Sequence, residues 1–285
     1  MIASPATAHA AQLFDVSGRA YVVTGAASGL GLAIAEVLAA NGGRLLLLDR
    51  DLKGLEVVAS RLQASATIQA VDVADVAALR QAVDAFIADT GRIDGLFANA
   101  GISGGAGFGT VVGMTSGQLE NQDGNHWHHI LDVNLLGVLN SLQAVVPAMK
   151  RQCSGSIVIT ASITGIQAEP FVSYSYAAAK AAVIQVMRQS ALELAPYGVR
   201  VNAIAPGFIK TGIAGGRLHD ADVYVGLSRK IPLGRLGVAN EVQGIALLLA
   251  SDAGSYITGS TLTVDGGALL GPPPIMYTPL TDTAR

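Results

Sequence analysis

The chain has 285 residues, of which 51% are hydrophobic and 14% are charged, and its net charge is −3. Basic and acidic residues are interspersed and form no basic stripe, which argues against a nucleic-acid partner. Its single cysteine, Cys153, excludes an intramolecular disulfide. The first residues lack the pattern of a signal peptide and no stretch reads as a membrane span, so we expect a cytoplasmic protein without a membrane partner.

From residue 19 onward, short apolar runs alternate with amphipathic segments of helical length. We expect strands near residues 20–23, 44–49, 67–71, 93–98, 156–161, 199–204 and 261–265. We expect helices between them, including residues 76–88, 127–150, 174–194 and 239–249. This alternation predicts an α/β fold, a Rossmann-like doubly wound sheet of about seven parallel strands flanked by helices.

No linker or change of composition divides the chain, so we expect a single domain over residues 1–285. Its core would cover about residues 15–267, with an arm at 1–14 and a non-helical tail at 268–285 that contains three consecutive prolines. Residues 102–125 are rich in glycine and predict a long surface loop, and residues 208–233 predict a second candidate lid.

A glycine-rich turn follows the first expected strand and precedes the first helix. It contains Gly25, Gly29 and Gly31, with Ser28 and Leu30 between them. Glycines at this position allow the backbone to approach a pyrophosphate, whose charge is stabilised by amides at the helix N-terminus. The position of the turn indicates a dinucleotide site, although the glycine spacing differs from the common G-x-G-x-x-G pattern.

Asp49 ends the second expected strand, 18 residues after Gly31. A carboxylate here accepts hydrogen bonds from the adenosine ribose and repels a 2′-phosphate, which favours NAD over NADP. Arg50 follows directly and offers a contact for a 2′-phosphate, so NADP remains the less favoured alternative.

Tyr176 and Lys180 lie four residues apart in an expected helix and therefore share one face, with only alanines between them. A nearby ammonium favours the phenolate, so we expect Lys180 to lower the pKa of Tyr176 from about 10 towards the working pH. Such a tyrosine can exchange a proton with an alcohol or a carbonyl while a hydride moves.

With these motifs in place, the chain resembles the short-chain dehydrogenase/reductase family over about residues 15–267. The segment TGAASGLG from Thr24 matches the family's glycine signature. The resemblance implies four catalytic residues: Asn134 holding a proton-relay water, Ser162 binding the substrate oxygen, Tyr176 as acid and base, and Lys180. It also implies that nicotinamide cofactor contacts are made by Gly25, Ser28, Gly29, Leu30, Gly31, Asp49, Arg50, Asp72, Val73, Asn99, Ala100, Gly101, Tyr176, Lys180, Pro206, Gly207, Ile209 and Thr211.

Two features depart from the family pattern. Ser162 and Tyr176 are 14 positions apart, one more than the commonest spacing. Tyr174 is an alternative, but it is six residues from Lys180 and faces elsewhere on a helix, so Tyr176 is the better candidate. The glycine-rich loop before Trp127 is longer than usual, so the resemblance does not define the entrance of the substrate pocket.

Two further groups of residues have more than one interpretation. His126 and His129 share a helix face near His128, but no carboxylate or cysteine completes a ligand set, so we expect no metal site. The segment from Glu169 to Phe171 is either a wall of the substrate pocket or an ordinary turn.

The leading functional hypothesis is the NAD-dependent interconversion of a secondary alcohol and a ketone. The alternatives are an NADPH-dependent ketoreductase and, less favoured, a non-catalytic NAD-binding regulator. The pocket should be built from residues 102–125, 163–173 and 208–230. A cyclic or aromatic substrate is indicated by the apolar side chains there, Ile102, Phe108, Val111, Ile163, Ile166, Phe171, Phe208 and Ile213. The resemblance further implies a homotetramer or dimer formed through the helices at 127–150 and 174–194.

Overall fold

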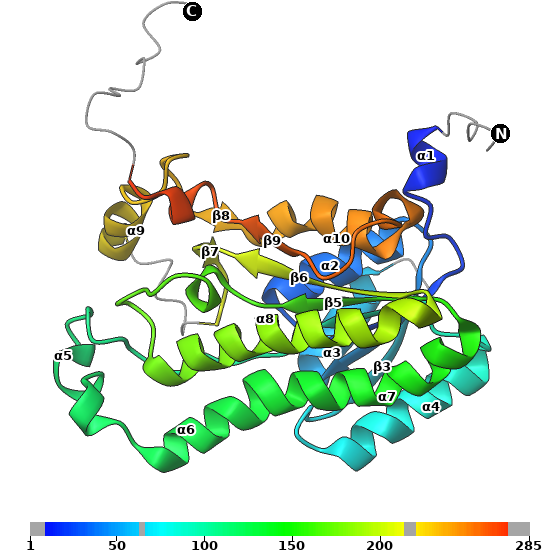
Figure 1. The fold of residues 1–285 in the computed structure, drawn as a ribbon, viewed down its shortest axis with the longest axis horizontal. Coiled ribbons are helices and arrows are strands. Elements are labelled where there is room, and N and C mark those ends of the chain that lie inside the picture. The colour runs from blue at the N-terminus through cyan, green and yellow to red at the C-terminus, as the bar shows by residue number, and fades with distance from the viewer. Residues whose placement is uncertain (1–8, 63–65, 214–220, 273–285) are drawn as a thin grey trace, which may run out of the picture.

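A computed structural model of the chain describes residues 9–62, 66–213 and 221–272. Its main sheet has seven parallel strands in the order β3-β2-β1-β4-β5-β6-β9 (Figure 1). The strands are β1 (Ala20–Thr24), β2 (Arg44–Asp49), β3 (Ala66–Ala70), β4 (Gly95–Ala98), β5 (Gly155–Thr160), β6 (Val199–Pro206) and β9 (Thr261–Val264). The predicted Rossmann-like α/β fold with seven parallel strands is confirmed.

Helices cover both faces of the sheet (Figure 1). One face packs on α4 (Val76–Thr90), α7 (Gly137–Gln152) and α8 (Tyr174–Leu194). The other packs on α2 (Gly29–Ala40), α3 (Leu52–Arg61) and α10 (Gln243–Ala250). Alternate residues of a strand point to opposite faces, so in β1 Val22 joins the first core and Tyr21 and Val23 the second. Burial on both sides explains why these strands are continuous apolar runs.

A long helical run passes from α6 (Gly124–Leu131) through a π-helical turn at Asp132–Leu136 into α7. It is the one helix in the described part of the chain that is long and apolar enough to span a membrane, a feature the sequence analysis did not anticipate. In this fold its apolar residues Val138, Val145 and Met149 are buried against the sheet and its neighbouring helices. The run therefore forms part of the core.

The segment at residues 102–125 is more ordered in structure than a plain loop. It contains the short helix α5 (Gly113–Ser116), a 3₁₀ turn at Leu119–Asn121 and an antiparallel bridge between Ala106 and Val172. Helix α6 begins at Gly124, earlier than predicted, because the Asp123 carboxylate accepts the first free amides of that helix.

The second candidate lid also contains regular structure. Strand β7 (Ile209–Lys210) pairs with β8 (Gly237–Val238), and α9 (Ala221–Ser228) lies between them in sequence. Residues 214–220 of this lid lie outside the described residues.

Both ends of the chain contain a short helix. The expected non-helical tail begins instead with a 3₁₀ turn at Ala268–Leu270, because Asp265 accepts the backbone amides of Gly267 and Leu269. The amino-terminal arm contains the short helix α1 (Ala10–Leu13). The rest of the arm and of the tail, residues 1–8 and 273–285, lies outside the described residues.

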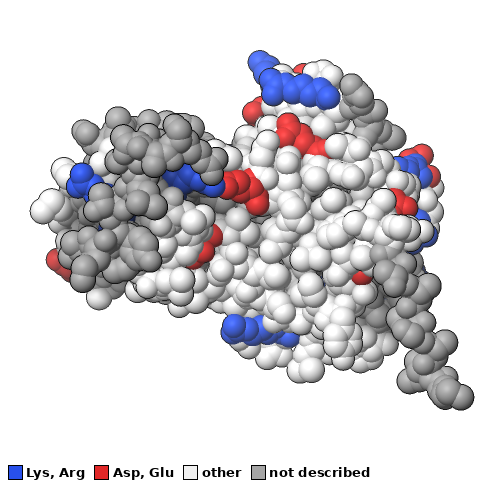
Figure 2. Space-filling view, turned by 90° about the horizontal axis from the view of Figure 1, so that it is seen from above, with Lys and Arg blue, Asp and Glu red and all other residues white. Residues whose placement is uncertain are grey.

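Charged side chains are scattered over the face of the molecule seen from above in Figure 2. On that face Lys and Arg side chains lie apart from one another, several of them next to Asp or Glu, and most of the surface between them is uncharged. This distribution offers no continuous positive track there.

Candidate active site

The motif residues gather at one edge of the sheet, because each follows or ends a parallel strand at its carboxyl end. In a doubly wound sheet this edge forms the ligand crevice, at the point where the strand order reverses. Here the order reverses between β1 and β4. Six of the seven strands contribute a group: Gly25 after β1, Asp49 in β2, Asp72 after β3, Asn99 after β4, Ser162 after β5 and Pro206 in β6.

The glycine turn leaves no room for side chains. Gly25 has a φ of +68°, and a Cβ there would lie 2.8 Å from the Cα of Ala100. A Cβ on Gly31 would lie 2.0 Å from the carbonyl oxygen of Gly25. Ser28, which precedes α2, makes no side-chain cap to any described residue, so the first amides of α2 stay available to an anion. A close-packed backbone with free amides fits the pyrophosphate of a dinucleotide.

Asp49 lies directly beside this turn. Its Oδ2 accepts the backbone N–H of Ala27 at 3.0 Å, and its Oδ1 accepts the N–H of Asp51 at 3.0 Å. The carboxylate is half-buried, whereas Arg50 is exposed. The structure therefore places the negative group next to the turn and leaves the positive one in solvent.

Asn99 joins the turn to the middle of the sheet. Its Nδ2 donates to the carbonyl oxygens of Thr24 and Gly25, both at 3.3 Å. The hydroxyl of Thr24 accepts the N–H groups of Asn99 and Ala100, each at 3.1 Å. Thr24 belongs to the quoted glycine signature, but its role as the acceptor that ties β1 to β4 was not predicted.

Asp72 and Val73 lie at the end of the crevice beyond β3. Asp72 is exposed and accepts the N–H of Ala74 at 2.9 Å, which fixes the turn into α4. Val73 is buried beneath α7, where a Cβ on Gly137 would be 2.5 Å from its Cγ2. This pair is therefore held firmly at the predicted adenine end.

Residues after β6 reach back to the glycine turn. Gly207 passes close to the backbone, since a Cβ there would lie 2.8 Å from the Cα of Asp265. Ile209 is buried in β7. A Cβ on Gly29 would lie 3.5 Å from the Cβ of Thr211, so residues 182 positions apart meet across the crevice.

Tyr176 lies in the first turn of α8 and is half-buried. The hydroxyl of Ser173 caps this helix by accepting the N–H of Tyr176 at 3.3 Å. The Ser162 hydroxyl, which accepts the hydroxyl of Thr164 at 3.0 Å, lies close enough to the Tyr176 phenol to act on its pKa. By contrast, the ring of Tyr174 stacks near Phe108, with centroids 5.8 Å apart. The structure therefore places Ser162 beside Tyr176, whereas Tyr174 lies against Phe108.

Lys180 is 2% exposed, and its Nζ donates to the carbonyl oxygen of Thr160 at 2.7 Å. The Nζ lies 5.6 Å from the centroid of the Tyr176 ring. Burial lowers the pKa of Lys180 to about 8. Burial also raises the pKa of Tyr176 to about 12, opposed by its hydrogen bond with Ser162.

The expected lowering of the tyrosine pKa by Lys180 is therefore wrong for this structure. The physical reason is that desolvation of the phenol outweighs the other influences on its pKa. The ammonium is itself desolvated and is engaged by the Thr160 carbonyl, so less of its charge acts on the ring.

Asn134 lies in the π-helical turn and is fully buried. Its Oδ1 accepts the N–H of Ile102 and its Nδ2 donates to the Ile102 carbonyl, both at 3.0 Å. A Cβ on Gly101 would lie 2.7 Å from the Asn134 Oδ1 and 3.7 Å from the Lys180 Nζ. Gly101 therefore lets Asn134 and Lys180 approach the same point.

The apolar residues expected to line the pocket are divided. Ile163 is buried, while Phe171 and Phe208 pack on a cluster formed by Leu227, Ile231 and Leu236. Val111 is 87% exposed, which places it on the outer surface and not in a pocket wall. Phe108, Ile166 and Ile213 are also exposed, because the segments that hold them lie at the surface.

The segment from Glu169 to Phe171 links the two predicted walls. The Lys230 Nζ lies 4.0 Å from Glu169 Oε1 and 4.0 Å from the centroid of the Phe171 ring. Burial raises the pKa of Glu169, and its buried Oε1 has no hydrogen-bond partner among the described residues. These contacts make the segment a junction between loops, more than an ordinary turn.

His126 contacts the glycine-rich segment, with its Nε2 2.9 Å from the carbonyl oxygen of Gly104. His128 and His129 are exposed. Across residues 9–62, 66–213 and 221–272, no cluster of three or more His, Cys, Asp or Glu side chains is placed to hold a metal ion.

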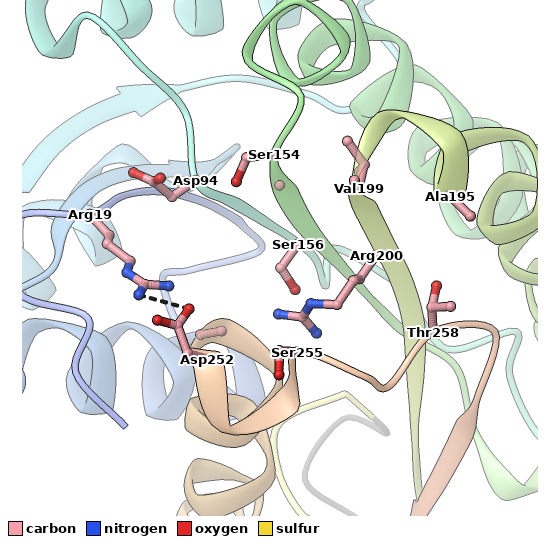
Figure 3. A pocket seen from close by; sticks show the side chains of 13 residues that line it. Arg19, Asp94, Ser154, Ser156, Ala195, Val199, Arg200, Asp252, Ser255 and Thr258 are labelled. Atoms are coloured by element: carbon pink, nitrogen blue, oxygen red, sulfur yellow. Dashed lines mark ion pairs between the residues drawn. The ribbon is translucent and has the colours of Figure 1, made fainter. Parts of the chain in front are cut away.

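A cavity of about 330 Å³ lies at the opposite edge of the sheet, by the amino ends of β5 and β6 (Figure 3). Its charged groups already have partners. Arg19 pairs with Asp252 at 2.9 Å, and the Arg200 Nη2 donates to the carbonyl oxygens of Leu249 and Ser251 at the end of α10. We interpret this cavity as a structural junction and not as part of the active site.

The sequence of the chain is similar to those of known proteins. A family model described as Enoyl-(Acyl carrier protein) reductase matches residues 25–268. The 3-oxoacyl-[acyl-carrier-protein] reductase FabG of Thermotoga maritima is 38% identical, covering 90% of this chain and 99% of the relative. A protein of Sinorhizobium fredii described as a short-chain type dehydrogenase/reductase is 35% identical, covering 90% of this chain and 99% of the relative.

Three solved structures share the fold. Levodione reductase has a TM-score of 0.81 and 34% identity, with coverage of 88% of this chain and 97% of that one. A gluconate 5-dehydrogenase of Burkholderia cenocepacia in complex with NADP and tartrate has a TM-score of 0.82 and 34% identity, with coverage of 92% of this chain and 99% of that one. NAD+-bound xylitol dehydrogenase has a TM-score of 0.80 and 30% identity, with coverage of 88% of this chain and 99% of that one. The chain therefore belongs to the short-chain dehydrogenase/reductase family of oxidoreductases.

Proposed function

We propose that this protein catalyses the NAD-dependent interconversion of a secondary alcohol and a ketone. The observation that carries the proposal is the placement of the Tyr176 side chain beside Ser162 and one helical turn from the buried Lys180. A phenol, a hydroxyl donor and a buried ammonium at the carboxyl edge of a doubly wound sheet form a proton-transfer site facing a dinucleotide crevice.

In the direction of alcohol oxidation, Ser162 orients the substrate oxygen and Tyr176 removes its proton. The Lys180 Nζ lies 5.6 Å from the centroid of the phenol ring, where it would hold the nicotinamide ribose beside Tyr176. Asn134, fixed by the Ile102 backbone, holds a water that connects Tyr176 to solvent. A nicotinamide cofactor held in this crevice would supply the hydride acceptor for the carbinol carbon, and its reduced form would supply the hydride for the carbonyl carbon in the reverse direction.

The residues present fit a dinucleotide along the whole crevice. The amides at Ser28–Gly31 would hold the pyrophosphate, and Asp49 the adenosine ribose. Tyr176 and Lys180 would contact the nicotinamide ribose. The remaining contacts would come from Arg50, Asp72, Val73, Asn99, Ala100, Gly101, Pro206, Gly207, Ile209 and Thr211. The half-buried Asp49 carboxylate supports NAD over NADP.

A second candidate is reduction of a ketone with NADPH. The exposed Arg50 beside Asp49 favours it, since it is free to turn towards a 2′-phosphate. The name of the Thermotoga maritima relative, a 3-oxoacyl reductase, and the NADP complex of the Burkholderia cenocepacia structure point the same way. A non-catalytic NAD-binding regulator is the least supported reading, because a pure binder needs no tyrosine held against Ser162 and Lys180.

We further propose that the substrate is apolar and cyclic or aromatic. The described residues that support this are the buried Ile163, next to Ser162 in sequence, and Phe171 and Phe208, which pack on an apolar cluster. We also propose a cytoplasmic location and a homotetramer or dimer formed through α6–α7 and α8.

The test is formation of reduced nicotinamide by the purified protein, with NAD+ and NADP+ in parallel across cyclic, aromatic, steroid and sugar secondary alcohols. Turnover with NAD+ on apolar cyclic alcohols supports the proposal. Turnover restricted to NADP+ would move the assignment to the ketoreductase. Tight binding of NAD+ without turnover on any alcohol or ketone of the panel would favour the binding-only reading.

A further inference from the structure

Asn99 supports the glycine turn from below. Its Nδ2 donates to the carbonyl oxygens of Thr24 and Gly25. It also lies under the first turn of α2, where a Cβ on Gly31 would be 2.6 Å away. The amide must therefore point its nitrogen towards the turn, and its oxygen must face the other way.

The oxygen of that amide faces Thr160. The Thr160 hydroxyl donates to Asn99 Oδ1 at 3.0 Å, and among the described residues it is the one donor to this atom. The contact follows from the sheet register, since Ala98 of β4 pairs with Ile159 of β5 and the next residue on each strand is Asn99 or Thr160. Thr160 is 9% exposed, so its hydroxyl is largely shielded from competing water.

Thr160 also contacts the proton-transfer site. Its carbonyl oxygen accepts the Lys180 ammonium at 2.7 Å. One residue therefore touches Lys180 through its backbone and, through its hydroxyl, the amide that supports the pyrophosphate turn. A valine at this position has the same shape and the same carbonyl but has no donor for Asn99.

We propose that Thr160 is a positioning residue whose hydroxyl locks the orientation of the Asn99 amide and thereby sets the affinity for the dinucleotide. The proposal rests on the proposed function, because it assumes that the glycine turn binds a nicotinamide dinucleotide. Without the hydroxyl, Asn99 Oδ1 loses its donor, and the amide is held only by its Nδ2 contacts with the turn, which weakens the support of the turn. The Lys180 contact, made by the backbone, remains.

The experiment measures the dissociation constant of NAD+ by calorimetry for the full chain and its Thr160→Val variant. We expect the constant to rise about tenfold, equivalent to about 1.4 kcal/mol. The KM for NAD+ should rise in parallel while kcat changes by less than about twofold, since no reacting group is altered. Thr160→Ser restores the donor and should bind NAD+ like the original protein.

Thr261 provides a matched control in the same sheet. Its buried Oγ1 has no hydrogen-bond partner in the described structure, so Thr261→Val removes the same atoms without losing a hydrogen bond. We expect this variant to retain its NAD+ affinity. In an Asn99→Ala background, Thr160→Val should add no further loss, because both changes remove the same coupling. If Thr160→Val does not fold, Thr160→Ala replaces it.

An unchanged dissociation constant in Thr160→Val overturns the proposal, and so does a Thr160→Ser variant as impaired as the valine. Equal falls in kcat and affinity that follow a lower thermal midpoint would indicate a merely structural role and also overturn it. If the original protein binds neither NAD+ nor NADP+, the proposed function fails as well. That outcome is distinct from tight binding of NAD+ that is unchanged in the Thr160 variants.

Discussion

Asp49 and Asp51 carry the same charge two residues apart but face different surroundings. Asp49 lies against the glycine turn, whereas Asp51 caps α3 at the surface. Asp49→Asn keeps an acceptor and removes the charge that repels a 2′-phosphate. We expect the ratio of kcat/KM for NADP+ over NAD+ to rise roughly tenfold or more, since about 1.4 kcal/mol is at stake.

Asp51→Asn is the matched control, because it removes the same charge and keeps a residue suited to capping the helix. Its cofactor ratio should stay close to that of the original protein. Equal changes in both variants would mean that the net charge of the region, and not the position of Asp49, governs cofactor choice.

Lys180 predicts a dependence of stability on pH. Its pKa is about 8 in the fold and 10.5 when unperturbed. Below pH 8 both states are protonated, and the folded protein bears the full cost of burying the charge. Between the two values the folded protein loses the proton first, so its stability rises with pH by about 2 to 3 kcal/mol.

Lys180→Met removes this cost, so at pH 7 the variant should be more stable than the original protein despite losing activity. The difference in the free energy of unfolding should shrink between pH 8 and pH 10, measured by urea denaturation. Lys150→Met is the control, because Lys150 is paired with Glu193 and its pKa is raised. A pH-independent difference for Lys180→Met would contradict the account.

At the scale of elements, the C-terminus of helix α10 is stabilised by a residue of strand β6. The guanidinium of Arg200 in β6 donates to the carbonyl oxygens of Leu249 and Ser251 at the C-terminus of the helix, and to that of Ile257. Arg200→Met removes the guanidinium from these carbonyls and leaves Leu249 and Ile257 with only their second donors, Ser156 Oγ and Asn202 Nδ2. We therefore expect a loss of about 1–3 kcal/mol in the free energy of unfolding. The change lies at the edge of the sheet opposite Tyr176, so kcat should not change.

Urea unfolding and steady-state kinetics on the same samples test this prediction. The exposed Arg188→Met on α8 is the control and should alter stability by less than about 0.5 kcal/mol. A large fall in kcat for Arg200→Met would show that the cavity in Figure 3 communicates with the active site.

The sequence predicts elements well where hydrophobic periodicity is strong. Strand β2 and helix α8 have the predicted limits, because a buried apolar run and a helix capped by Ser173 are local properties. The pairing of β7 with β8 was not predicted, since each has two residues and they meet only through the fold. The bridge from Ala106 to Val172 is hidden for the same reason.

At the active site, too, features that depend on local spacing were predicted, whereas features that depend on distant parts of the fold were not. Motif and helix spacing place Tyr176, Lys180 and Ser162 together, and the structure has them together. The raised pKa of Tyr176 and the hydrogen bond from Lys180 to Thr160 depend on burial and on a neighbouring strand. Sequence spacing contains no information on either.

At the scale of the whole molecule, the order of the parallel strands assembles the site. Six of the seven strands place a group at the same edge, and Thr211 meets Gly29 across the crevice although they are far apart in sequence. This topology explains why the motif residues lie close together, whereas the described residues of the segments at 102–125 and 208–233 contain short helices and strands that were not predicted. We expect the sheet to hold the catalytic groups and these two segments to define the substrate.

The most direct test of the account is the turnover of Tyr176→Phe with NAD+, measured together with its NAD+ dissociation constant. Phenylalanine keeps the ring and removes the hydroxyl that exchanges the proton. We predict that kcat falls by about a thousandfold while NAD+ binding changes by less than about threefold. A variant that binds NAD+ and retains kcat within about tenfold of the original protein would contradict the assignment of Tyr176 as the acid and base.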